Sequence, residues 1–168
     1  MEAGNRGNLA ALSALGALLL AAALFFGPVA YRSWQFQQRC AQMLEDALGG
    51  RLSQVASYVQ PEQRQLASTL FQTAVPANYT DYLHSLKLSN FSRESGDPDV
   101  IWALVTAKLS ASEGGSETSG LAQGKLRWVW NGRDWEWDFE GSYGAEFPGS
   151  GNANWIRLGD FITMESGE

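Results

Sequence analysis

Cysteine and histidine each occur only once in the 168 residues, as Cys40 and His84. A single cysteine excludes an intramolecular disulfide, so side-chain packing must hold the fold together. Cys40 lies on an apolar helical stripe, and no histidine is near it in the sequence to activate its sulfur. We therefore predict a buried, unreactive thiol at this position.

Charged residues are missing from one long stretch, between Arg6 and Arg32. The 25 residues of 7–31 are mostly apolar, and about 20 such residues span the hydrocarbon core of a bilayer. The alternative is a cleaved signal peptide, but the apolar region of such a peptide is only about 7–15 residues long. The pattern thus predicts a short polar tail at 1–7 and a retained transmembrane helix at 8–31.

Basic residues are too few to indicate a nucleic acid partner. Beyond Arg32 the chain carries 10 basic and 17 acidic residues, and it has no polybasic patch for anionic lipid. The two flanks of the apolar stretch differ little in positive charge, so the positive-inside rule discriminates weakly. Because the N-terminal tail is short, we expect a cytoplasmic N-terminus and an extracytoplasmic domain, in a plasma or inner membrane.

Small residues recur along the expected transmembrane helix. Ser13, Ala17 and Ala21 follow one another at a spacing of four, and Ala10 and Ala14 do the same. Such a strip lets another transmembrane helix approach closely. The alternative is that alanine is simply abundant in membrane spans. We predict that Ser13, Ala17 and Ala21 contact a partner helix within the bilayer.

Apolar residues recur at three- and four-residue spacing after the span, as on a helix that buries one face. The first such helix begins at Ser33 and ends at the glycine pair 49–50, since glycine commonly follows the last helical turn. A second, short helix covers 52–59. A third is opened by Pro61 and ended by Pro76. The residues expected to be buried on this third helix are Leu66, Leu70, Phe71 and Ala74.

The apolar period then changes from helical to alternating, which indicates strands. One strand is expected near 86–91, and another at 100–109, where β-branched and aromatic residues are frequent. The segment GDPD at 96–99 has turn chemistry. The serine- and glycine-rich segment 110–120 is expected to be a flexible loop. Together these patterns predict an α+β fold, in which a transmembrane helix precedes helices packed on a roughly four-stranded antiparallel meander.

Four of the seven tryptophans lie within the stretch KLRWVWNGRDWEWDF. Its Asn-Gly pair at 131–132 is a strong hairpin signal. A two-residue loop would pair Trp128 with Trp135, whereas a four-residue loop would pair Trp130 with Trp135 and Trp128 with Trp137. Both registers place all four indoles on one face, and a three-residue loop would not. We interpret the indole face chiefly as the core of the domain.

Opposite charges meet on the other face of this hairpin in both registers. Arg127 opposes Glu136 in the first register and Asp138 in the second, while Lys125 opposes Asp138 or Glu140. Each such pair stabilises a hairpin by about 0.2–1 kcal/mol. This pairing explains the three acidic residues better than catalysis does.

The region after 143 is rich in glycine and proline up to a short apolar segment. We predict a soluble domain at 32–143, followed by a linker and a C-terminal docking segment at 144–168. Because an isolated strand is not stable, this segment must either return to the sheet edge or dock on another chain. Its candidate partner-binding residues are Trp155, Ile156, Leu158, Phe161 and Ile162.

The order of elements resembles the nuclear transport factor 2-like, or cystatin-like, α+β cone. MLEDALGGRLSQVASYVQPEQRQLA at 43–67 looks like the helix–glycine turn–helix–proline opening of small members. WVWNGRDWEWDF at 128–139 looks like their closing hairpin, and the resemblance covers roughly 33–143. Enzymes of the family place Asp or His inside the cone, whereas His84 lies outside the strands expected around the cavity. The resemblance therefore implies a shape and no activity.

Few residues are candidates for chemistry. Asp81 and His84 have the spacing of a helical pair, but we interpret them as a surface helix start. Glu94, Asp97 and Asp99 lack the spacing of a calcium loop, so we interpret them as turn residues. The sequence contains no phosphate loop, metal-ligand cluster or nucleophile elbow. We therefore expect neither a cofactor nor a metal.

These features favour a non-enzymatic, single-pass accessory or assembly subunit of a respiratory, photosynthetic or secretion complex. Its expected partners are other transmembrane proteins of the complex and the lipid bilayer. One alternative is the bitopic component of a channel like those of type IV secretion. Another is a ligand-binding module with a tryptophan-lined cone. The wall of that cone would comprise Trp102, Trp128, Trp130, Trp135 and Trp137.

Overall fold

The computed structural model describes residues 27–113, 116–146 and 154–160, and the chain divides into two units, 1–38 and 39–168. In the first unit, 27–38 are helical. Within the described residues, no helix is both long and apolar enough to cross a membrane. Most of the predicted span lies outside them, at 8–26, and so does the whole strip of Ser13, Ala17 and Ala21.

The helices of the second unit follow the sequence patterns closely. The N-terminal helical segment runs to residue 48 and ends at the glycine pair, as predicted. It is followed by α2 (Leu52–Ser57), the short 3-10 helix η1 (Pro61–Gln63) and α3 (Arg64–Ala74). One detail of α3 is wrong in the prediction, because Ala67 is its buried residue and Ala74 is exposed. Three further helical residues follow in η2 (Tyr79–Asp81).

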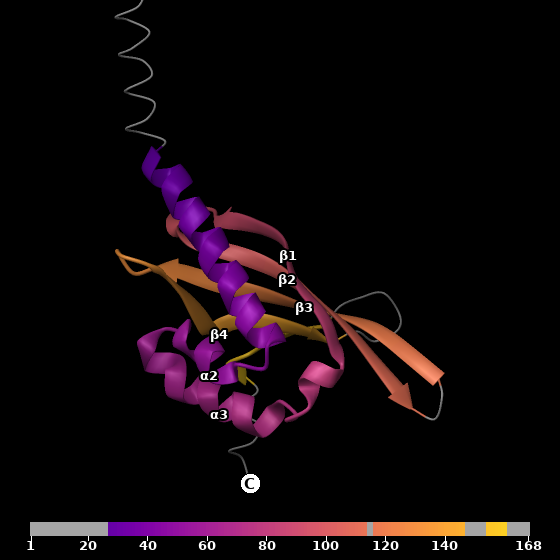
Figure 1. The fold of residues 1–168 in the computed structure, drawn as a ribbon. Helices are drawn as coiled ribbons and strands as arrows, with labels where there is room; N and C mark the ends of the chain where they lie inside the picture. The colour runs from indigo at the N-terminus through magenta and orange to yellow at the C-terminus, as the bar shows by residue number, and fades with distance from the viewer. Residues whose placement is uncertain (1–26, 114–115, 147–153, 161–168) are drawn as a thin grey trace, which may run out of the picture. The chain divides into compact units, whose positions relative to one another are not determined.

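An antiparallel sheet of five strands follows the helices, in the meander order β1-β2-β3-β4-β5. The α+β class is therefore confirmed, but the sheet has one strand more than the four predicted. The helical layer covers one face of this sheet (Figure 1). The strands are β1 (Leu83–Glu94), β2 (Asp97–Glu113), β3 (Ser116–Trp130), β4 (Trp135–Glu146) and β5 (Asn154–Arg157).

Two predicted connections turn out to be strand. The pairing of Glu94 with Asp97 makes a two-residue turn at 95–96, so Asp97 and Asp99 belong to β2 rather than to a turn. The predicted flexible loop 110–120 instead continues β2 and β3, which pair as far as Glu113 and Ser116. Long regular pairing with a neighbouring strand offsets the weak strand propensity of serine and glycine in this segment.

The tryptophan hairpin adopts the four-residue loop. Trp130 pairs with Trp135 and Trp128 pairs with Trp137. The Asn131 side-chain oxygen accepts hydrogen bonds from the amides of residues 133 and 134, at 2.9 and 2.8 Å. Gly132 has a φ of 96°, a value that glycine adopts without steric cost. The asparagine thus closes an Asx turn that favours the longer loop.

The hairpin register changes after Arg127. Arg127 opposes Asp138, as the four-residue register predicts, but Lys125 opposes Tyr143 instead of the expected Glu140. Residues 139–142 of β4 therefore form a bulge opposite the single residue Leu126 of β3. A bulge of this kind redirects the side chains that follow it.

Both halves of the outer edge of β4 are covered. Next to Trp137, the segment 58–60 runs alongside the strand, with the Trp137 amide donating to the Tyr58 carbonyl at 2.8 Å. Beyond the bulge, β5 pairs with 143–146. The predicted domain boundary at 143 thus falls inside β4, and residues 144–146 and 154–157 are part of the sheet. Covering an edge in this way prevents unwanted strand pairing.

Candidate functional site

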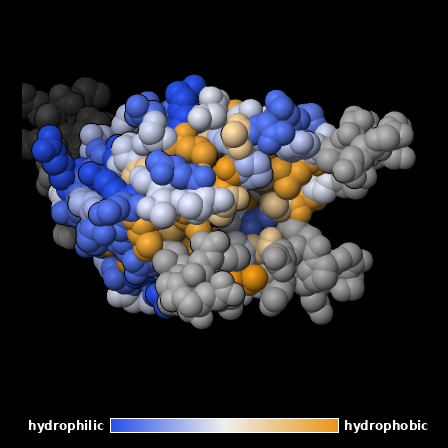
Figure 2. Space-filling model, turned by 90° about the horizontal axis from the view of Figure 1, so that it is seen from below, coloured by the Kyte–Doolittle hydropathy of each residue, from blue (hydrophilic) through white to orange (hydrophobic). Residues whose placement is uncertain are grey.

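A cavity of about 340 Å³ lies between the helical layer and the sheet. Its lining comes from the N-terminal helical segment, α2, α3 and the first four strands, and it is almost entirely apolar. Figure 2 shows apolar residues gathered in a hollowed part of the face seen from below, between hydrophilic residues. The lining residues are Met43, Leu44, Ala47, Leu52, Val55, Phe71, Val75, Tyr79, Leu86, Val105, Ala107, Ala122, Gln123, Gly124, Leu126 and Trp137.

A second hollow adjoins this cavity. It measures about 440 Å³ and shares Leu52, Phe71, Val75 and Tyr79 with the first. Its remaining lining includes polar residues such as Ser53 and Thr80. Small-molecule sites are typically lined by apolar side chains with a few polar groups.

An aromatic cluster forms one end of the cavity. Phe71 of α3 lies 6.3 Å from the Trp137 ring and 5.8 Å from the Phe139 ring, between centroids. Trp137 and Phe139 meet edge to face at 5.2 Å. Packing of this kind stabilises a core by about 0.5–1.5 kcal/mol per pair beyond the burial itself. The cluster therefore stabilises the cavity wall at this end.

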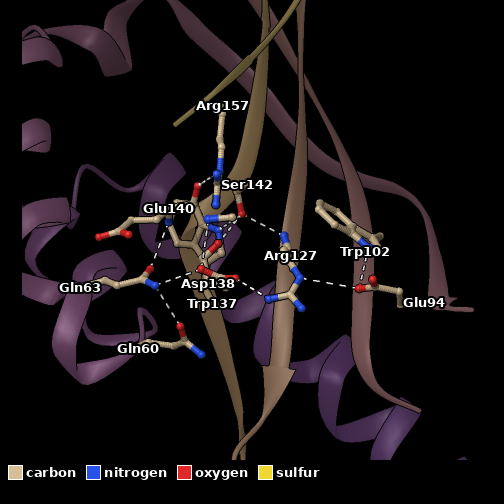
Figure 3. Close-up of polar contacts among 11 residues, drawn as sticks. Gln60, Gln63, Glu94, Trp102, Arg127, Trp137, Asp138, Glu140, Ser142 and Arg157 are labelled. Atoms are coloured by element: carbon tan, nitrogen blue, oxygen red, sulfur yellow. Dashed lines mark hydrogen bonds and ion pairs between the residues drawn. The ribbon is translucent and has the colours of Figure 1, made fainter. Parts of the chain in front are cut away.

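A polar network holds the bulge of β4 together (Figure 3). The Asp138 carboxylate accepts hydrogen bonds from Gln63 at 3.0 Å, from the Gly141 amide at 3.0 Å and from Arg127 at 2.6 Å. A Cβ added to Gly141 would collide with this carboxylate. The fully buried Ser142 donates to the Asp138 carbonyl at 2.7 Å.

The same serine hydroxyl accepts from the Trp137 indole at 2.8 Å and from the Arg127 amide at 2.9 Å. The Ser142 hydroxyl thus donates one hydrogen bond and accepts two, and it is not free to act as a nucleophile. Although burial alone would raise the pKa of Asp138, hydrogen bonds from Gln63, Arg127 and the Gly141 amide lower it below its ordinary value of 3.8. A carboxylate that is ionised at neutral pH serves as a structural anion here and not as a proton shuttle.

Asp138 is nearly inaccessible to solvent. The residue lies on the predicted face opposite Arg127, but only 8% of it is exposed. The predicted charge pair does form, and Arg127 also lies 3.7 Å from Glu94. Gln63, which the sequence did not single out, completes the site from η1. The Pro61 signal locates η1 in the sequence but gives no indication that Gln63 reaches β4.

The predicted ligand wall of five tryptophans is divided between two faces of the sheet. Trp128 and Trp135 are fully buried on the helix-covered face, and Trp137 lines the cavity there with 5% exposure. Trp130 packs against Trp135 at 5.5 Å. Trp102 pairs with Arg127 in the ladder, so its side chain lies on the opposite face.

The remaining candidates for chemistry are not brought together. Asp81 ends η2 and His84 lies in β1, so the two are not a helical pair, and the exposed His84 ring contacts the Ser110 hydroxyl. The placement of His84 outside the sheet is thus wrong. Glu94 accepts from the Trp102 indole at 3.3 Å, and Asp97 accepts from the Asp99 amide at 3.0 Å. No metal-binding group of His, Cys, Asp or Glu occurs among the residues that the structure describes.

Cys40 is fully buried on the apolar stripe, as predicted. Burial raises the pKa of its thiol to about 12. The thiolate is the nucleophilic form of cysteine, so this sulfur is unreactive at neutral pH. It packs in the core and supplies no chemistry.

One part of the sheet extends beyond its neighbours. The pairing of β1 with β2 ends at Leu109, and the pairing of β4 with β3 ends at Gln123. We call residues 111–113 of β2 and 116–119 of β3 the arm. In the described part of the chain, these residues pair with each other and with no third strand. The arm projects from the sheet in Figure 1. Two leucines at its base, Leu109 and Leu121, are 37% and 57% exposed.

The C-terminal segment takes the first of its two predicted alternatives. Trp155 and Ile156 lie in β5, opposite Ala145 and Gly144 of β4, and the Leu158 amide donates to the Ser142 carbonyl at 2.8 Å. Phe161 and Ile162 lie outside the described residues. A partner-binding role for the segment stays a prediction.

Comparisons with protein-family models, with curated proteins and with solved structures found no match to this chain.

Proposed function

We infer that this protein is a non-enzymatic, membrane-anchored accessory subunit that docks on a larger complex through its arm. The arm is the observation that carries the inference. A two-stranded ribbon is only marginally stable on its own, and its outer edges present backbone donors and acceptors. A partner protein that adds a strand to the ribbon, or covers it, would remove both costs.

Two further observations support the proposed membrane anchor. The long uncharged stretch of 7–31 has the length of a bilayer span. Directly after it, Tyr31 and Trp34 are 58% and 55% exposed, and their rings stack at 5.9 Å. Exposed aromatic rings at that position suit the interface between lipid and water. We place the sheet domain on the extracytoplasmic side of a plasma or inner membrane.

The fold itself is proposed to be of the nuclear transport factor 2-like kind. Helices that cover one face of a meander sheet, with an apolar cavity between the two layers, are compatible with such a cone. The bitopic component of a type IV secretion-like channel remains the more specific version of the accessory-subunit proposal. A respiratory or photosynthetic complex could equally be the host of such a subunit.

Charging the base of the arm tests the docking proposal. We expect the double variant Leu109→Lys/Leu121→Lys to lose at least about tenfold in co-purified partner, because each buried leucine contributes about 1.5–3 kcal/mol. The measurement is quantitative mass spectrometry of the tagged full-length chain, purified in mild detergent. Native electrophoresis of the same samples should show wild type in a large species and the variant near its own mass.

Gln65→Lys/Thr69→Lys is the matched control, since it adds the same two charges at exposed positions on α3, away from the arm. This variant should co-purify like wild type. The docking role of the arm would be contradicted by either of two results. One is a wild-type chain that migrates alone, and the other is equal recovery of partner by the double variant and wild type.

A second function is supported by the cavity. Its volume of about 340 Å³ lies within the range of small-molecule sites, about 300–1,000 Å³. Apolar side chains from both layers face it, with few polar groups to select a charged ligand. The ligand that fits is a small apolar molecule, taken up between the helices and the sheet.

Filling the cavity tests this second function. We expect wild type to bind the fluorescent probe N-phenyl-1-naphthylamine, and Ala107→Phe to bind it about tenfold more weakly or worse, because the new ring occupies the probe's volume. The measurement is a fluorescence titration of the full-length protein in detergent, with the signal of a protein-free detergent sample subtracted.

Lys108→Phe serves as the control, because position 108 is exposed and points to the opposite face of β2. It should leave the affinity unchanged. Wild type that takes up no probe, or equal affinities in the two phenylalanine variants, would argue that the cavity binds nothing.

A further inference from the structure

The face of the sheet opposite the helices carries a second, different hollow. It measures about 420 Å³ and, among the described residues, is lined by Trp102, Lys125, Tyr143 and Trp155, one from each of β2, β3, β4 and β5. The Trp102 and Tyr143 rings lie 6.1 Å apart at an angle of 36°. The Lys125 ammonium sits 4.1 Å from the centre of the Trp155 ring. We call these four residues the aromatic cleft.

Among the described lining residues, Lys125 is the only charged one, and the bulge of β4 is the reason that no acidic residue opposes it. Without the bulge, the hairpin register would place Glu140 opposite Lys125. The bulge instead brings Tyr143 to that position. Glu140 points elsewhere, and its carbonyl accepts from Arg157 at 2.9 Å. Within the part of the chain that the structure describes, no carboxylate forms an ion pair with Lys125.

The neighbouring cation, Arg127, differs from Lys125 in having acidic partners. Arg127 lies next on the same face of β3, and it is paired with Asp138 at 2.6 Å and with Glu94 at 3.7 Å. The Trp102 indole N–H is also used, by Glu94 at 3.3 Å. One positive charge therefore remains available in the cleft, beside three aromatic rings that are only half-buried. Aromatic rings stabilise that charge but do not neutralise it.

We propose that the aromatic cleft binds a ring compound that carries a carboxylate. The ring would pack against the aromatic side chains and the carboxylate would pair with the Lys125 ammonium, as a charge-assisted hydrogen bond. Repulsion from Lys125 disfavours a cationic ligand. Two sources share this chemistry, namely an aromatic acid and a uronic acid, whose sugar ring presents an apolar C–H face to an indole. This site is separate from the cavity and from the arm, so it does not depend on the proposed function.

The test is calorimetric titration of the full-length protein in detergent with two probes, indole-3-acetate and a glucuronate oligosaccharide. We expect saturable binding of at least one probe, and neutral analogues, indole-3-ethanol and a glucose oligosaccharide, should bind about tenfold more weakly or worse. Binding of the first probe alone assigns the cleft to aromatic acids, and binding of the second alone assigns it to acidic glycans.

Three variants locate the binding. Lys125→Met keeps the aliphatic stem and removes the charge, and Trp155→Ala removes one wall; each should weaken binding by about tenfold or more. Arg133→Met removes a charge from the exposed hairpin loop and should bind like wild type. The thermal transition of every variant is recorded to establish that it is folded. No saturable binding of either probe at millimolar concentration, or unchanged binding by folded Lys125→Met, would overturn the proposal.

Discussion

Replacing Trp128 with alanine is expected to lower the free energy of unfolding by about 3–5 kcal/mol, the usual cost of removing a large aromatic side chain from a core. Trp128 is fully buried, and its ladder partners Ile101 and Trp137 are almost as inaccessible. A chain of this size is typically stable by only about 5–15 kcal/mol, so the loss is a large fraction of the total. The measurement is urea unfolding of the full-length chain in detergent, followed by circular dichroism.

Trp102→Ala is the matched control for this variant. It removes the same side chain from the opposite face of the sheet, where Trp102 is only half-buried and packs on Tyr143. We expect roughly half the loss of Trp128→Ala or less, because less apolar surface returns to water. Equal losses in the two variants would contradict the assignment of the core to the helix-covered face.

Replacing Asp138 with asparagine is expected to cost about 1.5–3 kcal/mol of stability, the range of a hydrogen bond to a charged group. The variant keeps the shape of the side chain but removes the charge that pairs with Arg127, and an amide cannot accept on both sides from Gln63 and Arg127. Arg127 retains Glu94 nearby, so the cost stays below that of a fully orphaned buried charge. Urea unfolding at neutral pH measures the loss.

The same variant should also flatten the acid dependence of stability. The folded pKa of Asp138 lies below its ordinary value of 3.8, so on acidification the unfolded chain takes up the proton first. The stabilisation by Asp138 is therefore complete above the ordinary value and is lost as pH falls through the folded value. Wild type should lose stability in this window, and Asp138→Asn should lose less.

Asp46 also has a lowered pKa, because Arg51 and Tyr58 donate hydrogen bonds to it, and it keeps part of the acid dependence in both proteins. Glu136→Gln is the control, since it removes one negative charge from the same face of β4, at a position that is less buried than Asp138. Stability of Glu136→Gln should stay within about 0.5 kcal/mol of wild type. Parallel pH profiles for wild type and Asp138→Asn would contradict the structural role assigned to the carboxylate.

The helices and the indole face were predictable because their signals are local. Three of these signals act within one or two helical turns: the apolar stripe that contains Cys40, the glycine pair 49–50, and Pro61. The structure has helices with the limits that these signals predict. The four-residue hairpin loop was one of two registers left open. The Asn131 side chain decided between them, through hydrogen bonds to two amides of the loop.

The arm shows where local signals mislead. Serine and glycine at 110–120 have weak strand propensity, and composition alone indicates a loop. Pairing of β2 with β3 nevertheless continues through this segment to Glu113 and Ser116. Each backbone hydrogen bond of the ladder depends on the strand opposite, and residue composition does not report that strand.

By itself, the sequence determined which residues form the periodic apolar faces, where the helices stop and that the four hairpin tryptophans share one side. Only the tertiary structure decided that Trp102 faces the other way, that Lys125 loses its acidic partner and that the last strand returns to the sheet. The physical reason is the range of the interactions. Periodicity and turn chemistry act between neighbours in the chain, whereas the bulge of β4 is held by Gln63, 75 residues before Asp138, and no local pattern encodes such a contact.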